Sequence, residues 1–281
     1  MAKILFDIAV ANGTAGLPDA HLVMEVSPHI FSYALLDNAK NLLHLRFYEL
    51  DALNNPELAK ELNGIILTDE VMKSEIAKKT FLYNFPESQL IPEQYFNTGA
   101  GQDLIELFHG DLNKGITLSE RIEGSTQYNV FRVPEEVHTL LQQSFSNSHY
   151  WHYYSLWMQC SQQQMHAKPT WLSVMFYPNR MLVAIVKEKQ LQLVQSYVYE
   201  AAEDVGYYLL NICDQLQLSP QDTPVILSGM IDVSSALYTE IFKYFGQVEL
   251  EGYPGEKPGP ALLDYPDHFF SPLLKLAICV S

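Results

Sequence analysis

The stretch that decides the fold is LVMEVSPHIFSYALL, residues 22–36, together with its repeat LSVMFYPNRMLVAIV, residues 172–186. In each stretch two apolar runs flank a turn that contains proline, which is typical of a β-hairpin. A shift of 150 positions superposes the two stretches without a gap, with Leu22 on Leu172, Pro28 on Pro178 and Ala34 on Ala184. A shared proline at equal spacing is harder to obtain by chance than matching apolar residues. The sequence therefore predicts a duplicated unit.

A third strand and then alternating helices and strands follow each hairpin. Residues 42–50 and 191–199 are predicted as the third strands, and the same shift places Leu43 on Leu193 and Phe47 on Tyr197. The remaining elements were assigned from apolar periodicity and capping residues. They are helices near 53–62, 104–108, 137–145, 202–216, 235–244 and 269–279, and strands at 81–85, 225–227 and 247–251. Each half is predicted to be an α/β unit of the βββαβαβ type.

The repeat sets the predicted domain boundaries. We expect a first half over residues 1–147 and a second over 148–281, with the last helix, 269–279, able to pack back on the first half. Hydrophobic residues make up 48% of the 281 residues, with 17 Tyr and 14 Phe, which is enough to build a core in each half.

The charge balance argues against polyanionic partners. Asp and Glu number 33 against 17 Lys and Arg, a formal net charge of -16. Such a field repels phosphate backbones and anionic lipid surfaces, so we expect neither nucleic-acid binding nor membrane insertion. No stretch approaches the ~20 apolar residues of a membrane-spanning helix.

The cysteines and the N-terminus indicate a cytoplasmic protein. Cys160, Cys213 and Cys279 are odd in number, far apart and without metal-ligand spacing, so the sequence predicts neither a disulfide framework nor a metal centre. Residues 4–11 loosely imitate a secretory signal, but Asp7 interrupts the apolar run. We therefore expect a reducing compartment.

Four short segments carry a closer resemblance. They are QLIPEQYF at 89–96, residues 197–208 with their EDVGYY core, LSGMID at 227–232 and SALY at 235–238. As a set they resemble an uncharacterised bacterial family whose known fold is actin-like, and more distantly pilus-assembly proteins of that fold. The resemblance covers most of the chain. It implies a duplicated actin-like, or ribonuclease H-like, fold.

The resemblance also implies where a nucleotide would sit. Active members of the superfamily hold ATP between the halves: a turn in the first hairpin of each half meets phosphate with backbone amides, and its Asp organises metal and water. A Gly-Gly pair after a short strand in the second half lies against adenosine. Here the turns contain Pro28 and Pro178, and proline has no N–H to donate to phosphate. Ser228 and Gly229 take the place of the pair, with Met230 where the second glycine would be, and Glu25 is the one candidate for the organising carboxylate.

Other constellations have simpler interpretations. His149 and His152 share a spacing that a helical metal site could use, but ordinary hydrogen-bonded histidines at a strand-to-helix junction are the favoured interpretation. The aromatic cluster at 151–157 is expected to pack in the core rather than anchor a partner. The segment at 12–16 lacks the lysine of a phosphate loop.

The first hypothesis is a cytoplasmic pseudo-ATPase: a non-catalytic binding or scaffold module without cofactor, metal or catalytic residues, acting on an unknown protein partner. Ser228, Gly229 and Glu25 are its candidate ligand-site residues, in the cleft between the halves. An active ATPase or kinase with unorthodox nucleotide contacts is the alternative. A structural subunit of a larger assembly is the third, and the sequence does not define the oligomeric state.

Overall fold

The computed structural model describes residues 2–10, 17–112, 114–162, 168–255 and 262–281. The chain divides into two compact units. The first unit comprises residues 1–160, 258–262 and 276–281, and the second comprises 161–257 and 263–275. The boundary predicted between residues 147 and 148 stays a prediction about the duplicated halves.

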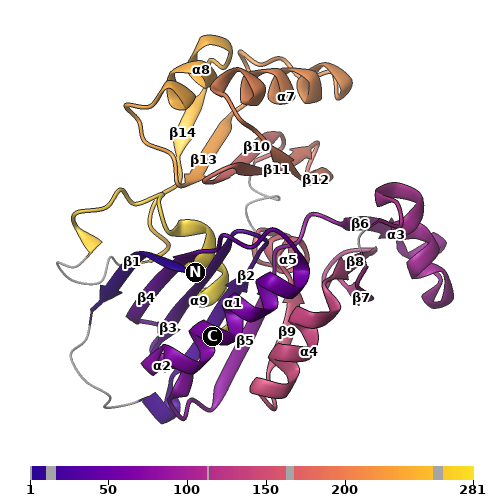
Figure 1. Cartoon of the computed structure of the whole chain (residues 1–281). Helices are drawn as coiled ribbons and strands as arrows, with labels where there is room; N and C mark the ends of the chain where they lie inside the picture. Colours follow the sequence, from indigo (N-terminus) through magenta and orange to yellow (C-terminus); the bar gives the residue numbers. More distant parts are fainter. Residues whose placement is uncertain (1, 11–16, 113, 163–167, 256–261) are drawn as a thin grey trace. The chain divides into compact units, whose positions relative to one another are not determined.

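The first unit is built on a six-stranded sheet (Figure 1). Its strands are β1 (Lys3–Ala9), β2 (His21–Val26), β3 (Ile30–Leu36), β4 (Leu42–Glu49), β5 (Lys78–Tyr83) and β9 (His149–His152). In the order β1-β4-β3-β2-β5-β9, the first four strands are antiparallel, and β5 and β9 run parallel to β2. Strand β1 was not predicted: its apolar run loosely imitates a secretory signal, but in the structure it pairs with β4.

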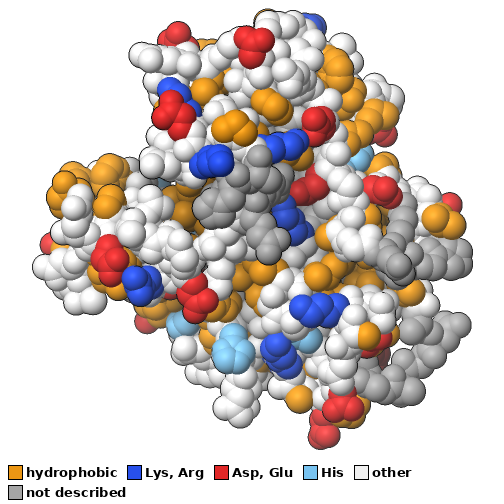
Figure 2. All heavy atoms as spheres, turned by 180° about the vertical axis from the view of Figure 1, so that it is seen from behind, with side chains coloured by type: hydrophobic (Ala, Val, Ile, Leu, Met, Phe, Trp, Pro, Cys, Tyr) orange, Lys and Arg blue, Asp and Glu red, His pale blue; other side chains and the backbone are white. Residues whose placement is uncertain are grey.

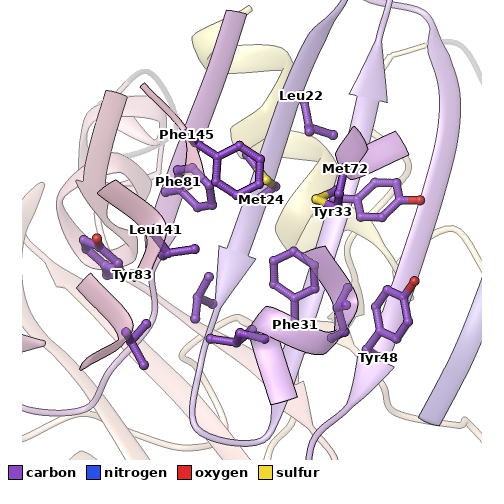
Figure 3. Close-up of a cluster of buried hydrophobic side chains, with 14 of the residues drawn as sticks. Leu22, Met24, Phe31, Tyr33, Tyr48, Met72, Phe81, Tyr83, Leu141 and Phe145 are labelled. Atoms are coloured by element: carbon purple, nitrogen blue, oxygen red, sulfur yellow. The ribbon is translucent and has the colours of Figure 1, made fainter. Parts of the chain in front are cut away.

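Helices and a large aromatic core complete this sheet. The helices are α1 (Asn55–Thr68), α2 (Glu70–Lys73), α4 (Glu135–Ser144) and α5 (Tyr153–Cys160). The side chain of Asn54 caps α1 by accepting a hydrogen bond from the Glu57 amide. Figure 3 shows the core between the sheet and helices α1, α2 and α4, with Met24, Phe31 and Phe81 among its residues. Leu53, predicted on the apolar side of the helix, precedes α1 and is exposed.

A small three-stranded sheet was not predicted. It has the order β6-β8-β7 and consists of β6 (Ser88–Pro92), β7 (Ile116–Arg121) and β8 (Gln127–Val133), with helix α3 (Gly101–His109) beside it. Ile91 of β6 and Val130 of β8 form a separate small cluster with Ile105 of α3, whereas Phe131 and Val133 of β8 belong to the large core. A strand as exposed as β7 has no strong apolar alternation, so periodicity alone does not identify it.

The second unit repeats the plan of the first (Figure 1). Its sheet has the order β12-β11-β10-β13-β14. The strands are β10 (Trp171–Tyr177), β11 (Arg180–Lys187), β12 (Gln190–Val198), β13 (Val225–Gly229) and β14 (Val248–Leu250), and the helices are α7 (Ala202–Gln215) and α8 (Ala236–Tyr244). Helix α9 (Ser271–Val280) begins in the second unit, and its residues from Leu276 onward belong to the first. Three antiparallel strands are again followed by two parallel ones, β13 and β14. The predicted duplicated α/β fold is confirmed.

Strand pairing confirms the repeat across both hairpins. Leu22 pairs with Leu35, and Leu172 pairs with Ile185, so the offset of 150 holds on both strands. Pro28 and Pro178 therefore occupy equivalent turns. The residues predicted to line the cores are all fully buried: Leu22, Met24, Val26, Ala34, Leu172, Val174, Ala184, Val225 and Leu227.

The third strand breaks the predicted register by one residue. Ser32 pairs with Phe47, whereas its counterpart Leu182 pairs with Ser196, so Phe47 corresponds to Ser196 and the prediction of Tyr197 was wrong. The turn explains the slip. In the first unit, three residues separate Asp37 from Asn41, which close the turn between β3 and β4. In the second unit, only two residues separate β11 from β12, and both have positive φ: Glu188 at 54° and Lys189 at 64°. Two such residues form the tight type I′ turn that suits a twisted hairpin.

A disulfide bond corrects the prediction from the cysteines. Cys160 and Cys279, 119 residues apart in sequence, are bonded, and the buried Cys213 is free. Sequence spacing could not reveal this pair because helices α5 and α9 bring the two sulfur atoms together only in the folded chain. In the described ranges, no helix is both long and apolar enough to cross a membrane.

Candidate functional site

The first hairpin turn is closed on itself. The Ser27 amide donates to the Ile30 carbonyl at 2.9 Å, and the Ile30 amide donates to Ser27 Oγ at 3.1 Å. Ser27 Oγ also donates to the Ile30 carbonyl at 3.0 Å. Pro28, between these residues, has no N–H. The amides of Ser27 and Ile30 are therefore already used within the turn.

The second turn is filled by side chains. The Arg180 guanidinium lies 4.8 Å from the centre of the Tyr177 ring, a cation–π contact across the turn. Tyr199 donates its hydroxyl to the Tyr177 carbonyl at 2.8 Å. The Tyr199 amide donates to the Asn179 carbonyl at 3.2 Å. The Tyr177 ring, the Arg180 guanidinium and the Tyr199 hydroxyl thus lie at the turn that the resemblance assigns to phosphate.

Ser228 and Gly229 end β13 beside Phe176 of β10. Gly229 has φ 81°, and a Cβ there would collide with the Phe176 carbonyl oxygen, so the position requires glycine. Its amide donates to the His268 carbonyl at 2.8 Å, and the next amide, of Met230, donates to the Phe176 carbonyl at 2.8 Å. Ser228 Oγ is fully buried and has no hydrogen-bond partner within the described residues. The predicted residues Ser228 and Gly229 are therefore adjacent at the end of β13, and the amides of Gly229 and Met230 already donate hydrogen bonds within the protein.

Glu25, the third predicted site residue, belongs to the first unit. It lies near the end of β2 with 1% of its surface exposed. Its Oε1 accepts a hydrogen bond of 2.6 Å from Asn84, the residue just beyond β5. The carboxylate is thus held inside its own unit by the neighbouring parallel strand.

The first unit also contains a cavity that was not predicted from the sequence. Its volume is about 880 Å³, and it lies between α1, the start of α2, and strands β1 and β4. Arg46 and Tyr48 of β4, with Asp69 between the two helices, supply its buried polar groups. The alternation of His44, Arg46 and Tyr48 along one face of β4 is the sequence signal that could have found it.

Asp69 organises this cavity. Its Oδ2 accepts hydrogen bonds from Tyr48 Oη at 2.5 Å, Arg46 Nη1 at 2.7 Å and Tyr33 Oη at 3.2 Å, and its Oδ1 accepts one from the Val71 amide at 2.8 Å. Burial alone would raise the pKa of Asp69, but the hydrogen bonds and the Arg46 charge outweigh it and hold the pKa below its ordinary value. Burial and the bond to Asp69 raise the pKa of Tyr48 to about 12.

Arg46 joins Asp69 to the edge strand. Its Nε and Nη2 donate to the two oxygens of Asp7 at 2.9 and 2.8 Å, a bidentate pair, and His44 Nε2 lies 2.6 Å from Asp7 Oδ1. Two carboxylates therefore share one guanidinium, which leaves Arg46 little capacity to bind an anion. The arrangement fixes β1 and α2 onto β4 and forms a polar floor for the cavity.

The remaining predicted residues have structural roles. His149 and His152 lie on strand β9, not on a helix face; His149 is exposed, and the buried His152 has Nε2 3.0 Å from the Phe85 carbonyl oxygen. Tyr153, Tyr154 and Trp157 are buried, as predicted for packing residues. In the described residues, no group of three or more metal-ligating side chains is found. The segment at 12–16 lies outside the described residues.

A hairpin, a third antiparallel strand and two parallel strands, present in both units, match the pattern expected of the actin-like ATPase fold, and solved structures agree. The chain resembles a Bacteroides thetaiotaomicron protein with actin-like ATPase fold and unknown function, with 16% identity, a TM-score of 0.75, and coverage of 84% of this chain and 91% of that one. It also resembles a structure of the PilM-PilN type IV pilus biogenesis complex, with 11% identity, a TM-score of 0.57, and coverage of 92% and 98%. The predicted actin-like fold is confirmed.

The chain belongs to the family described as "Protein of unknown function (DUF3822)", whose model matches residues 14–248. No curated protein matches the chain significantly. The predicted resemblance to an uncharacterised family with an actin-like fold, and to a pilus-assembly protein of that fold, is thus confirmed.

Proposed function

We propose that this protein is a non-catalytic binding or scaffold module whose phosphate-binding turns are degenerate. One observation carries the proposal: amides at the positions that the fold uses for nucleotide already donate within the protein. Those of Ser27, Gly229 and Met230 each donate to a carbonyl oxygen of the chain at 2.8–2.9 Å. A phosphate would have to displace these bonds, and Pro28 and Pro178 have no N–H with which to replace them.

Ser228, Gly229 and Glu25 are proposed as residues of a vestigial or altered ligand site. The unpartnered hydroxyl of Ser228, buried beside Gly229, supports this assignment because an unsatisfied buried polar atom calls for an explanation. Glu25 is a poorer candidate for organising metal and water, since Asn84 already engages its carboxylate.

The proposed ligand is a protein. The related PilM structure was solved as a complex with PilN, which supports a protein partner for this fold. The face drawn in Figure 2 carries separate Lys and Arg side chains with Asp and Glu among them, which does not favour a polyanion such as nucleic acid. The expected cytoplasmic location remains a proposal, and the Cys160–Cys279 bond argues instead for an oxidising setting.

Calorimetry with ATP and magnesium tests the proposal against the alternative of an active ATPase or kinase. We expect no affinity tighter than roughly millimolar, since micromolar binding needs ~8 kcal/mol of net free energy. A parallel assay should detect no magnesium-dependent phosphate release. A micromolar dissociation constant, or phosphate release that a Glu25→Gln change abolishes, would show that the protein is an active ATPase or kinase rather than a pseudo-ATPase.

A further inference from the structure

β12 is the outermost strand of the second unit's sheet. It covers nine residues, Gln190–Val198, and within the described ranges it pairs only with β11. The strand at the opposite edge, β14, covers three residues. A long edge strand presents a row of backbone N–H and C=O groups that can pair with another strand.

In the first unit, another strand covers the sheet edge that corresponds to β12. By the repeat, β4 is the counterpart of β12, and β1 pairs with β4 in antiparallel orientation from Lys3 to Ala9. Charges help to hold β1 in place, because Asp7 binds Arg46 of β4 and Lys3 lies 3.8 Å from Glu49. In the part of the chain that the structure describes, the second unit has no strand equivalent to β1.

The composition of β12 indicates what kind of strand fits it. Its sequence, QLQLVQSYV, contains no charged residue, no proline and no glycine, although 18% of the whole chain is charged. Native edge strands usually carry lysine, proline or a bulge that blocks pairing along the strand; the one irregularity here lies near its start, opposite Ile185 and Val186. A strand that covers β12 needs no complementary charge, unlike the strand that covers β4.

β12 itself meets this requirement. Antiparallel pairing of two β12 strands places no like charges opposite each other, even though each chain has a net charge of -16. The side chains of Gln190, Gln192 and Gln195 are exposed, and each amide both donates and accepts hydrogen bonds, so they can pair across a two-fold axis. The exposed Val198 would also be partly covered.

We propose that β12 pairs antiparallel with β12 of a second copy of this chain, which joins two second-unit sheets into one continuous sheet. The interface is isologous, with the same surface on both copies. Because nine paired residues bury less surface than a standard interface, we expect a weak, reversible dimer that dissociates at micromolar concentrations. The proposal does not depend on whether the protein binds nucleotide.

The experiment measures molar mass by light scattering from about 1 to 300 μM, a range that spans the expected dissociation. The wild-type chain should change from monomer to dimer across it. The double change Gln192→Lys and Gln195→Lys places like charges at the pairing edge and should weaken the dimer by about tenfold or more. The matched control is Gln215→Lys, an exposed position at the end of α7, which should leave the dimer unchanged.

Hydrogen exchange on the wild-type chain gives a second readout that needs no variant. Amides of β12 should become more protected as concentration rises, whereas those of α7 should not change. A wild-type chain that stays monomeric at 300 μM overturns the proposal. So does a dimer that the β12 lysines leave intact, or one that Gln215→Lys disrupts equally.

Discussion

Cys160, at the end of α5, and Cys279, in the last turn of α9, form a disulfide bond with their Cα atoms 6.1 Å apart. The last turns of α9 are also held by polar contacts: Lys40 Nζ donates to the Ile278 carbonyl at 3.0 Å, and Lys78 Nζ donates to the Val280 carbonyl at 2.8 Å. The C-terminal end of the chain is therefore fixed to the first unit both covalently and by hydrogen bonds.

Removing this disulfide should destabilise the protein. Reduction, or Cys160→Ser, frees a loop of 119 residues in the unfolded chain and is expected to cost about 2–5 kcal/mol of unfolding free energy. Denaturant unfolding with and without reductant measures the difference. Reductant should have no further effect on the Cys160→Ser variant. Equal stability of the oxidised and reduced wild-type chains would contradict the prediction.

Asp69 should be the most sensitive residue of the cavity. Asp69→Asn removes the negative charge that Arg46 and Tyr48 share, and is expected to cost about 3 kcal/mol because a buried pair is broken on one side. Thermal or denaturant unfolding measures the loss. Glu70→Gln, at the adjacent and exposed carboxylate, is the matched control and should have little effect. Similar losses for both variants would show that Asp69 has no special role.

Strand β13, which lies between β10 and β14 in the second unit's sheet, should not tolerate a charge. Val225→Asp or Leu227→Asp places a carboxylate at a fully buried position, and each is expected to cost several kcal/mol. Leu250→Asp, on the neighbouring β14 at 38% exposure, is the control and should cost far less. Unchanged melting temperatures of the β13 variants would argue against their burial in this sheet.

His21 should make folding sensitive to acid. Its ring nitrogens lie 2.8 Å from Ser281 Oγ and 2.9 Å from Thr80 Oγ1, and burial, with the nearby Lys78 charge, lowers its pKa to about 4 from 6.5. The unfolded chain therefore binds a proton that the folded chain excludes, so stability from this group is present above about pH 6.5 and is lost as pH falls toward 4.

The measurement compares His21→Gln with the wild-type chain. The comparison is needed because burial raises the pKa of Glu120 to about 7, and that group changes stability in the opposite direction over the same range. The variant should gain about 3 kcal/mol relative to wild type between pH 7 and pH 4. A difference that stays constant with pH would mean that folding does not change the pKa of His21.

Replacing the two turn prolines by glycine should not create ATPase activity. Pro28→Gly and Pro178→Gly together return backbone N–H groups, but no Asp stands in either turn, and Tyr177 and Arg180 still occupy the second one. We expect neither phosphate release nor micromolar ATP binding from the double variant, as measured by calorimetry. Activity in this variant would show that the prolines alone disable the site.

The sequence by itself determined the duplicated α/β fold and the equivalence of Pro28 and Pro178. Both depend on local patterns, namely apolar runs, turn residues and their spacing, and these are visible along the chain. Ser228 and Gly229 were identified through the resemblance to the actin-like superfamily, and the structure supplies the reason for the glycine, a backbone with φ 81°.

Only the tertiary structure decided the contacts between distant segments. The one-residue slip that pairs Ser196 with Leu182 follows from a turn shortened by one residue, and apolar matching cannot detect it. The bond between Cys160 and Cys279 and the meeting of Asp7, Arg46 and Asp69 join residues tens to over a hundred positions apart. Sequence spacing carries no information on such pairs, because their proximity is set by how helices and strands pack rather than by any local preference.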